Sequence, residues 1–242
     1  PALMSQWPAA GSLSFDTQLG LILGGARDLD GMTGATALDA LRTGLSGLLH
    51  ARRRVGPRVV ASAVEHSAIL LPARYAAPQA DDAAALDEVP VDRAGRVDLA
   101  RWVEALAGPG TAVAALQSAN GEVGTRQPVP EALDGCRRHG IPLLVDATAG
   151  LGRDPVPVGY DVLAGDARSW GGPGGVGVLV VPARTRWRRP AAPSELEGGR
   201  TDVEPVIPLV LAAAEAWRQT AAQAGADQAL ARVLVDRIRA AA

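Results

Sequence analysis

The feature that most constrains the fold is an alternation of helical and strand-like segments that begins near residue 34. Four segments are predicted to be helices, and they span residues 36–49, 67–75, 97–106 and 130–139. Short apolar or β-branched runs are predicted to be strands, and they span residues 58–63, 111–116, 142–146, 161–165 and 177–181. This alternation predicts an α/β domain in which helices cover both faces of one sheet.

The last segment of the chain, residues 204–242, is rich in alanine and predicted to be mostly helical, with a break near Gly225. We therefore divide the chain into an α/β domain, 1–204, and a helical connector, 205–242. An isolated helix needs its apolar side chains buried, so we expect this one to associate with another surface. The apolar residues concerned are Leu209, Leu211, Trp217, Leu230, Val233, Leu234 and Ile238.

Composition excludes several classes of protein. The formal net charge is −2, which gives no bulk attraction to nucleic acid, and the arginine-rich loop 184–189 is expected to be a solvated loop. The single cysteine, Cys136, excludes a disulfide framework and is expected to be structural, on a surface helix. The sequence has neither a membrane-length apolar run nor a secretory signal at its N-terminus. We expect a soluble cytoplasmic protein without nucleic-acid or membrane partners.

Three polar positions fall where ligands bind in open α/β sheets, beyond the carboxyl ends of the strands. Thr36 precedes a helix, so its hydroxyl either holds a phosphate or caps that helix. His66 follows a strand and either stacks on a ring or caps the next helix. Asp146 ends an apolar strand, where a carboxylate needs a cationic ligand nitrogen or a backbone cap as its partner.

A glycine-rich loop, residues 171–177, leads into the last predicted strand. Glycines permit a close backbone approach to a ligand. As a phosphate loop it is weak, because it precedes a strand and matches neither a dinucleotide fingerprint nor a Walker motif.

Together these segments resemble the cysteine desulfurases, which belong to the class V aminotransferase group of fold-type-I enzymes that use pyridoxal phosphate (PLP). The resemblance runs from about residue 20 to 217, and its motifs occur in the family's order. They are Gly34-Ala35-Thr36, Val64-Glu65-His66-Ser67-Ala68, Asn120-Gly121-Glu122-Val123-Gly124, Val145-Asp146-Ala147-Thr148 and the Gly172–Gly177 loop, and Arg200 to Val206 is similar to the segment that follows them. The resemblance implies a mixed, mostly parallel sheet and the large domain of such an enzyme, with the C-terminal small domain and its catalytic cysteine loop expected to be missing.

The resemblance also assigns roles to individual residues. Ala35 and Thr36 match the phosphate grip, and His66 matches the histidine that stacks on the pyridine ring. Asp146 matches the carboxylate that keeps the pyridinium nitrogen protonated. We interpret these four positions as a vestigial cofactor site.

Other positions depart from the family's pattern, and the most severe departure is the Schiff-base lysine, which is Ser169 here. The sequence contains no lysine, so all 24 of its basic residues are arginine. Serine supplies neither the amine nor the base that this chemistry needs, and Arg168 is too basic to replace it. Four further departures are Gly121 and Ala149 for two amide side chains, Val203 for a threonine that crosses the dimer, and Asp166 for a phosphate-binding serine.

These losses predict a non-catalytic, partner-binding subunit, with no catalytic residue and no covalent cofactor. We expect a homodimer or hetero-oligomer that forms through the large-domain face and the 205–242 helix. Two alternatives stay open: an enzyme that a partner chain completes, and a protein that binds PLP or a related phosphate weakly and without a covalent bond. No metal site is predicted.

Overall fold

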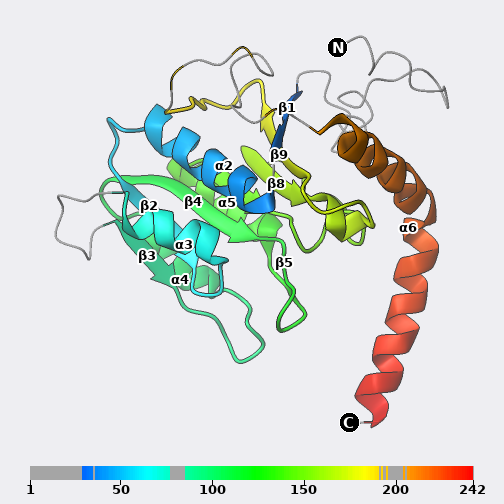
Figure 1. Cartoon of the computed structure of the whole chain (residues 1–242). Helices are drawn as coiled ribbons and strands as arrows, with labels where there is room; N and C mark the ends of the chain where they lie inside the picture. The colour runs from blue at the N-terminus through cyan, green and yellow to red at the C-terminus, as the bar shows by residue number, and fades with distance from the viewer. Residues whose placement is uncertain are drawn as a thin grey trace.

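A seven-stranded sheet forms the centre of the molecule (Figure 1). The computed structural model describes residues 29–34, 36–76, 85–190, 192, 195, 204 and 206–241. In spatial order the strands are β1 (Leu29–Gly34), β9 (Gly177–Pro182), β8 (Val162–Asp166), β7 (Leu143–Asp146), β4 (Thr111–Gln117), β2 (Arg58–Ser62) and β3 (Leu86–Val89). Neighbours pair in parallel from β8 to β3, whereas β9 is antiparallel to both β8 and β1. The predicted mixed, mostly parallel sheet is confirmed.

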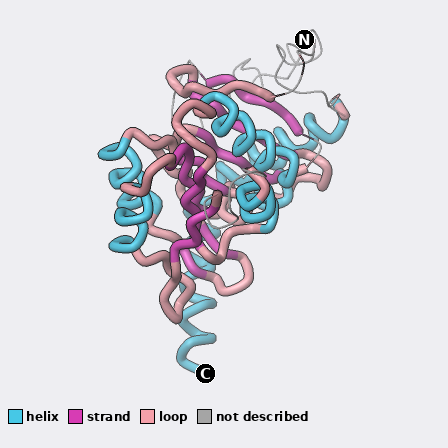
Figure 2. The backbone as a smooth tube through the Cα atoms, turned by 90° about the vertical axis from the view of Figure 1, so that its left-hand side faces the viewer, coloured by secondary structure: helices cyan, strands magenta, loops and turns pink. Residues whose placement is uncertain are grey.

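Helices cover both faces of this sheet, as Figure 2 shows from the side. On one face lie α2 (Ala37–Ala51) and α3 (Ser67–Arg74); on the other lie α4 (Leu99–Leu106), α5 (Val129–His139) and the start of α6 (Ile207–Ala241). The interior strand β4 is buried along its whole length because its side chains pack against the helices on both faces of the sheet. Its side chains alternate: Val113 and Ala115 join the α2 side, while Ala114 and Leu116 join the α5 side.

The predicted elements agree with the observed ones to within about two residues at each end. Five elements were not predicted: β1, the polar edge strand β3, the strands β5 (Ala119–Asn120) and β6 (Thr125–Arg126) of a small hairpin, and the 3-10 helix η2 (Ala167–Trp170). Strand β3, the two hairpin strands and η2 are each at most four residues long, and the burial pattern of β3 does not alternate. Parallel pairing with β2 holds β3 in place, and Val89 at its end is buried in the core.

Helix α6 is continuous, so the predicted break near Gly225 is wrong. A single exposed glycine costs only about 1 kcal/mol relative to alanine, and the surrounding alanines favour the helix. The helix instead divides by environment. Its first part buries Val210, Ala213 and Trp217 on the body, whereas its end projects beyond the body (Figure 1). Exposed large apolar side chains of that end are Leu230, Val233, Leu234, Val235 and Ile238.

Burial corrects one smaller prediction and adds detail to another. Cys136 was expected on a surface helix, but it lies on the buried face of α5, and burial raises its thiol pKa to about 12. In the loop after β9, Trp187 is half-buried against Gly47 of α2. This indole is therefore part of the packing, whereas Arg184, Arg186 and Arg188 are exposed, as expected for a solvated loop. None of the helices in the described part of the chain combines the length and apolar character that crossing a membrane requires.

Candidate functional site

A cavity of about 400 Å³ opens beyond the carboxyl ends of β7 and β8, beside the N-terminus of α2. It lies at the edge of the sheet where the sequence predicted a ligand site. Two predicted positions, His66 and Ser169, line it, together with Asp166 and Ala149. The remaining lining residues are Ala37, Leu38, Leu41, Thr148, Arg153 and Arg168. Ala35 and Val203 lie outside the described residues.

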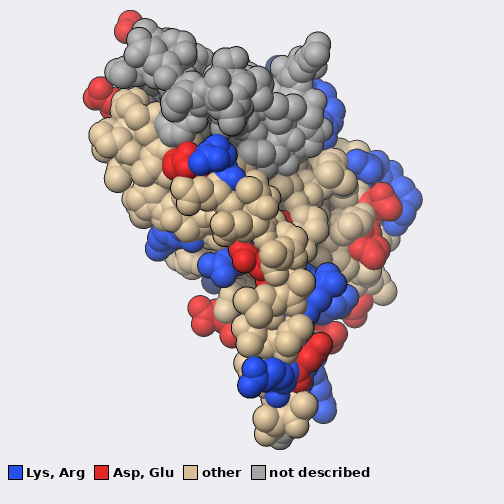
Figure 3. Space-filling view, turned by 90° about the vertical axis from the view of Figure 1, so that its right-hand side faces the viewer, with Lys and Arg blue, Asp and Glu red and all other residues tan. Residues whose placement is uncertain are grey.

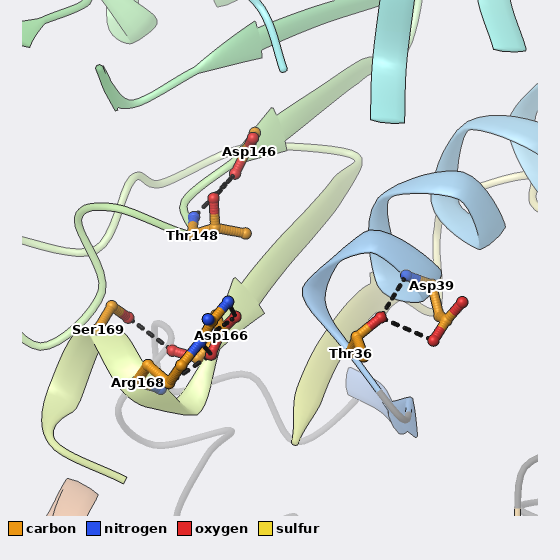
Figure 4. A network of polar contacts seen from close by, with 7 residues as sticks. All are labelled: Thr36, Asp39, Asp146, Thr148, Asp166, Arg168 and Ser169. Carbon is orange, nitrogen blue, oxygen red and sulfur yellow. Dashed lines mark hydrogen bonds and ion pairs between the residues drawn. The ribbon is translucent and has the colours of Figure 1, made fainter. Parts of the chain in front are cut away.

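Thr36 caps helix α2. Its Oγ1 accepts a hydrogen bond from the backbone N–H of Asp39 at 3.2 Å and donates to the Asp39 carboxylate at 2.7 Å. The alternative that the sequence left open, ordinary capping, therefore describes the geometry in this structure (Figure 4). Both hydrogen-bonding roles of the hydroxyl are used within the chain.

His66 caps helix α3 in the same way. Its Nδ1 accepts a hydrogen bond from the backbone N–H of Ala68 at 3.0 Å. The imidazole ring nevertheless remains exposed and lines the cavity. Capping fixes the ring in one orientation while leaving a face open, so the role of a stacking surface stays compatible with this geometry.

Asp146 ends β7 as a buried carboxylate. One of its oxygens accepts hydrogen bonds from the N–H of Thr148 at 2.8 Å and from the Thr148 hydroxyl at 2.6 Å. Burial raises the pKa of Asp146, and the two bonds from Thr148 oppose that shift. The partner that the sequence required for this carboxylate is therefore a backbone and side-chain cap, and no guanidinium pairs with it among the described residues.

A second carboxyl group, Glu65, lies buried next to Asp146. Its Oε1 accepts hydrogen bonds from the Ser62 hydroxyl and the Gln117 N–H, both at 2.9 Å, while its Oε2 is buried without a hydrogen-bond partner in the described structure. Burial, and then the charge of Asp146, raise the pKa of Glu65 to about 8. Glu65 is therefore protonated at neutral pH, and it ties the start of α3 to the end of β4.

At the end of β8, the Asp166 carboxylate forms a two-pronged ion pair with Arg168 (Figure 4). The Arg168 Nη2 donates to one carboxylate oxygen at 2.6 Å, and Nε lies 3.1 Å from both oxygens. The backbone N–H of Arg168 adds a bond of 2.9 Å. Such paired geometry is among the strongest arrangements between arginine and a carboxylate. The sequence analysis identified Asp166 as a negative charge in place of a phosphate-binding serine, but it did not predict the ion pair with Arg168.

Ser169 follows in η2, and its hydroxyl donates to the backbone carbonyl of Asp166 at 2.7 Å. The Nε of Arg153 donates to the backbone carbonyl of Ser169 at 3.0 Å, so a second guanidinium group reaches the same wall of the cavity. Arg153 was missed from the sequence because it lies in a loop with no motif around it. Only the fold brings it to η2.

Comparisons with known proteins agree with this fold. The aminotransferase class-V family model matches residues 32–218. The chain is 32% identical over 221 residues to cysteine desulfurase IscS 1 of Archaeoglobus fulgidus, covering 90% of this chain and 56% of that protein. It is 33% identical over 234 residues to a probable cysteine desulfurase of Pseudomonas putida, covering 84% and 56% respectively. The chain thus spans about half the length of these curated relatives.

Solved structures give the same result. The crystal structure of DndA from Streptomyces lividans superposes with a TM-score of 0.82 at 25% identity, covering 93% of this chain and 64% of that one. A NifS-like protein superposes with a TM-score of 0.78 at 21% identity, which supports the fold alone. The resemblance inferred from the motifs is confirmed at the level of family and fold.

The residues of the cavity fit PLP only in part. His66 lines the cavity and offers a ring face, and the buried carboxylate of Asp146 lies behind the lining residue Thr148, as the cofactor's ring would need. In the cavity wall, the Asp166 carboxylate occupies the Nε and Nη2 donors of Arg168. The chain has no lysine, so it supplies no lysine amine for the aldehyde of PLP.

Proposed function

Because the chain belongs to the aminotransferase class-V family, we propose that it is a cysteine desulfurase-like protein whose own cavity no longer performs PLP chemistry, and that it acts by binding a partner protein. The proposal separates two questions that can be tested independently. One concerns the chemistry of the cavity, and the other concerns the surface that binds the partner.

The observation that carries the first part is the environment of Ser169. A lysine at this position would serve as the amine that captures the aldehyde and as the base that moves a proton. Ser169 has no nitrogen in its side chain, and its hydroxyl is already engaged with the Asp166 carbonyl. Arg168 beside it is held by Asp166, which raises its pKa further and removes it as a base.

Helix α6 supports the second part. Its projecting end carries five exposed apolar side chains, with relative exposures of 40–68%. Figure 3 faces this helix and shows uncharged surface along it, interrupted by charges of both signs. Burying five such side chains would contribute several kcal/mol to association, at about 25 cal/mol for each Å² of apolar surface. We infer that this end is part of the protein's binding surface, with a second copy of the chain as the first partner to test.

The catalytic part is tested by incubating the purified chain with PLP and cysteine. We expect no sulfide release above a heat-treated control and no visible absorbance band of a covalent PLP–amine adduct. The variant Ser169→Lys is expected to restore neither, because Asp166 still occupies Arg168. Sulfide release by the wild type would contradict the proposal. Release only after adding a second purified protein would instead support the alternative of an enzyme completed by a partner chain.

The binding part is tested by light scattering at micromolar concentration. We expect species larger than the 24.8 kDa chain, and a shift toward monomer in the double variant Leu234→Gln/Ile238→Gln. Arg232→Gln, on the same exposed end of α6, is the matched control and should leave the association unchanged. A wild type that is monomeric at every concentration would contradict self-association through this helix.

A further inference from the structure

The cavity is lined by charged side chains of both signs. Two guanidinium groups, Arg153 and Arg168, and one carboxylate, Asp166, line the same space. The Asp166 side chain is buried, with 7% exposure, whereas the Arg168 side chain that binds it is 68% exposed. A buried carboxylate thus lies inside the cavity with its counter-ion toward the opening.

The Asp166 carboxylate caps the short helix η2, and the donors that it uses are ones that an external oxyanion could also use. It accepts one bond from a backbone N–H and a paired set from the guanidinium of Arg168. Backbone amides together with arginine are the common donors for phosphate in proteins. No other carboxylate lines the cavity among the described residues.

We propose that the cavity contains an oxyanion site which the chain fills with its own Asp166 carboxylate, so that phosphate groups on free ligands are excluded. The site and its internal occupant lie two residues apart in the sequence. An external anion would have to displace Asp166 from Arg168 while remaining close to that displaced charge. Like charges at contact distance repel strongly even at a surface-like dielectric.

This inference concerns the same cavity as the proposed function but does not depend on the missing lysine. An anion needs donors and positive charge, and it forms no covalent bond. The experiment therefore uses inorganic phosphate, which cannot react with an amine. Its result is independent of the assays for sulfide release and for a PLP adduct, so either idea can fail without the other.

The central variant is Asp166→Asn. Asparagine keeps the side-chain oxygen that accepts the Arg168 N–H and so preserves the local turn, but it lacks the negative charge. With the charge removed, Arg168 loses its internal counter-ion, and Arg153 still contributes positive charge to the same cavity. We expect the variant to bind inorganic phosphate at least about tenfold more tightly than the wild type at low ionic strength, as measured by isothermal titration calorimetry.

Two further variants test whether the gain in phosphate binding comes from the Asp166–Arg168 pair. Asp154→Asn also replaces an ion-paired aspartate, but its partner is Arg126 and neither residue lines the cavity, so phosphate binding should stay at the wild-type level. The double variant Asp166→Asn/Arg168→Gln should lose the gain. Circular dichroism checks that each variant is folded. Asp166→Ser, which removes the charge with a smaller side chain, replaces Asp166→Asn if the latter does not fold.

The outcomes separate clearly. A gain in Asp166→Asn or Asp166→Ser that Arg168→Gln abolishes would support the self-filled site. Wild-type phosphate affinity equal to that of the charge-free variants would overturn it, because Asp166 would then not exclude anions. A gain that persists without Arg168 would overturn it too, because the site would lie elsewhere.

Discussion

Two strand-end aspartates, one in the lining of the cavity and one behind it, make the same local hydrogen bond with opposite results. At the end of β7, Asp146 accepts the N–H of the residue two positions later, and at the end of β8, Asp166 does the same. The side chain at that later position differs: Thr148 offers a neutral hydroxyl, and Arg168 offers a guanidinium. One carboxylate therefore stays without a counter-charge, while the other is neutralised within the chain. A strand-end aspartate is thus not a ligand site by itself, because the residue two positions later decides whether it remains available.

The largest expected loss of stability is at Trp170, in the helix η2 that Asp166 caps. Its indole is buried against Trp217 with ring centroids 5.0 Å apart, and its N–H donates to the Ala213 carbonyl at 2.9 Å. Trp170→Ala should lower the free energy of unfolding by about 3–5 kcal/mol, because it leaves a cavity beneath η2 and α6. Urea denaturation measures this loss. Trp170→Phe keeps a ring but loses the hydrogen bond, so it should cost less; equal losses in the two variants would argue against the packing explanation.

The next effect concerns the environment of Asp146 and its pH dependence. The folded protein keeps Glu65 protonated up to about pH 8, whereas the unfolded chain releases that proton near the ordinary value of 4.5. The contribution of Glu65 to stability is therefore complete below about pH 4.5 and is lost as pH rises through 8. The slope approaches about 1.4 kcal/mol for each pH unit within this window. The raised pKa of Asp146 acts in the same direction.

The variant Glu65→Gln should flatten this dependence, because glutamine keeps the oxygen that accepts from Ser62 and Gln117 and has no charge to bury. It should be more stable than the wild type above pH 8. Melting temperatures between pH 5 and 9 provide the measurement, and Glu122→Gln on the exposed hairpin is the matched control. A wild-type profile that Glu65→Gln leaves unchanged would show that Glu65 is not the titrating group.

A smaller effect distinguishes the two hydrogen bonds that Thr148 donates to Asp146, one from its hydroxyl and one from its backbone N–H. Thr148→Val removes the hydroxyl bond to Asp146 with little change in shape, so it should cost about 1–2 kcal/mol and raise the pKa of Asp146 further. Thr148→Ser keeps the hydroxyl and should restore most of the loss. Thermal denaturation at pH 6 gives the comparison. If valine and serine were equivalent, Asp146 would be held by its backbone bond alone.

The smallest effect is expected at Ser169. Ser169→Ala removes one hydrogen bond to the Asp166 carbonyl, which is worth about 1 kcal/mol. Because the hydroxyl has only this structural contact, adding Ser169→Ala to Asp166→Asn should leave the gained phosphate binding unchanged. A large loss of phosphate binding in Asp166→Asn/Ser169→Ala would place an oxyanion donor at the Ser169 hydroxyl as well as at Arg168. The pair of measurements thus refines the location of the proposed anion site.

The sequence alone determined the order of the main helices and strands, the family and the absence of lysine. The alternation of helix and strand and five motifs in order carry that information locally, so His66, Asp146 and Ser169 could be placed without a structure. The composition settled the missing amine directly, since no fold can supply a residue that the chain lacks.

Only the tertiary structure decided which partners the site residues have. The Asp166–Arg168 pair, the reach of Arg153 to η2 and the burial of Glu65 beside Asp146 depend on orientation and on loops that the sheet brings together. The same is true of α6, whose apolar residues form one set in the sequence but separate into a packed part and a projecting part. A hydrophobic pattern in the sequence indicates that a side chain needs an apolar surface to pack against, but only the tertiary structure determines which surface that is.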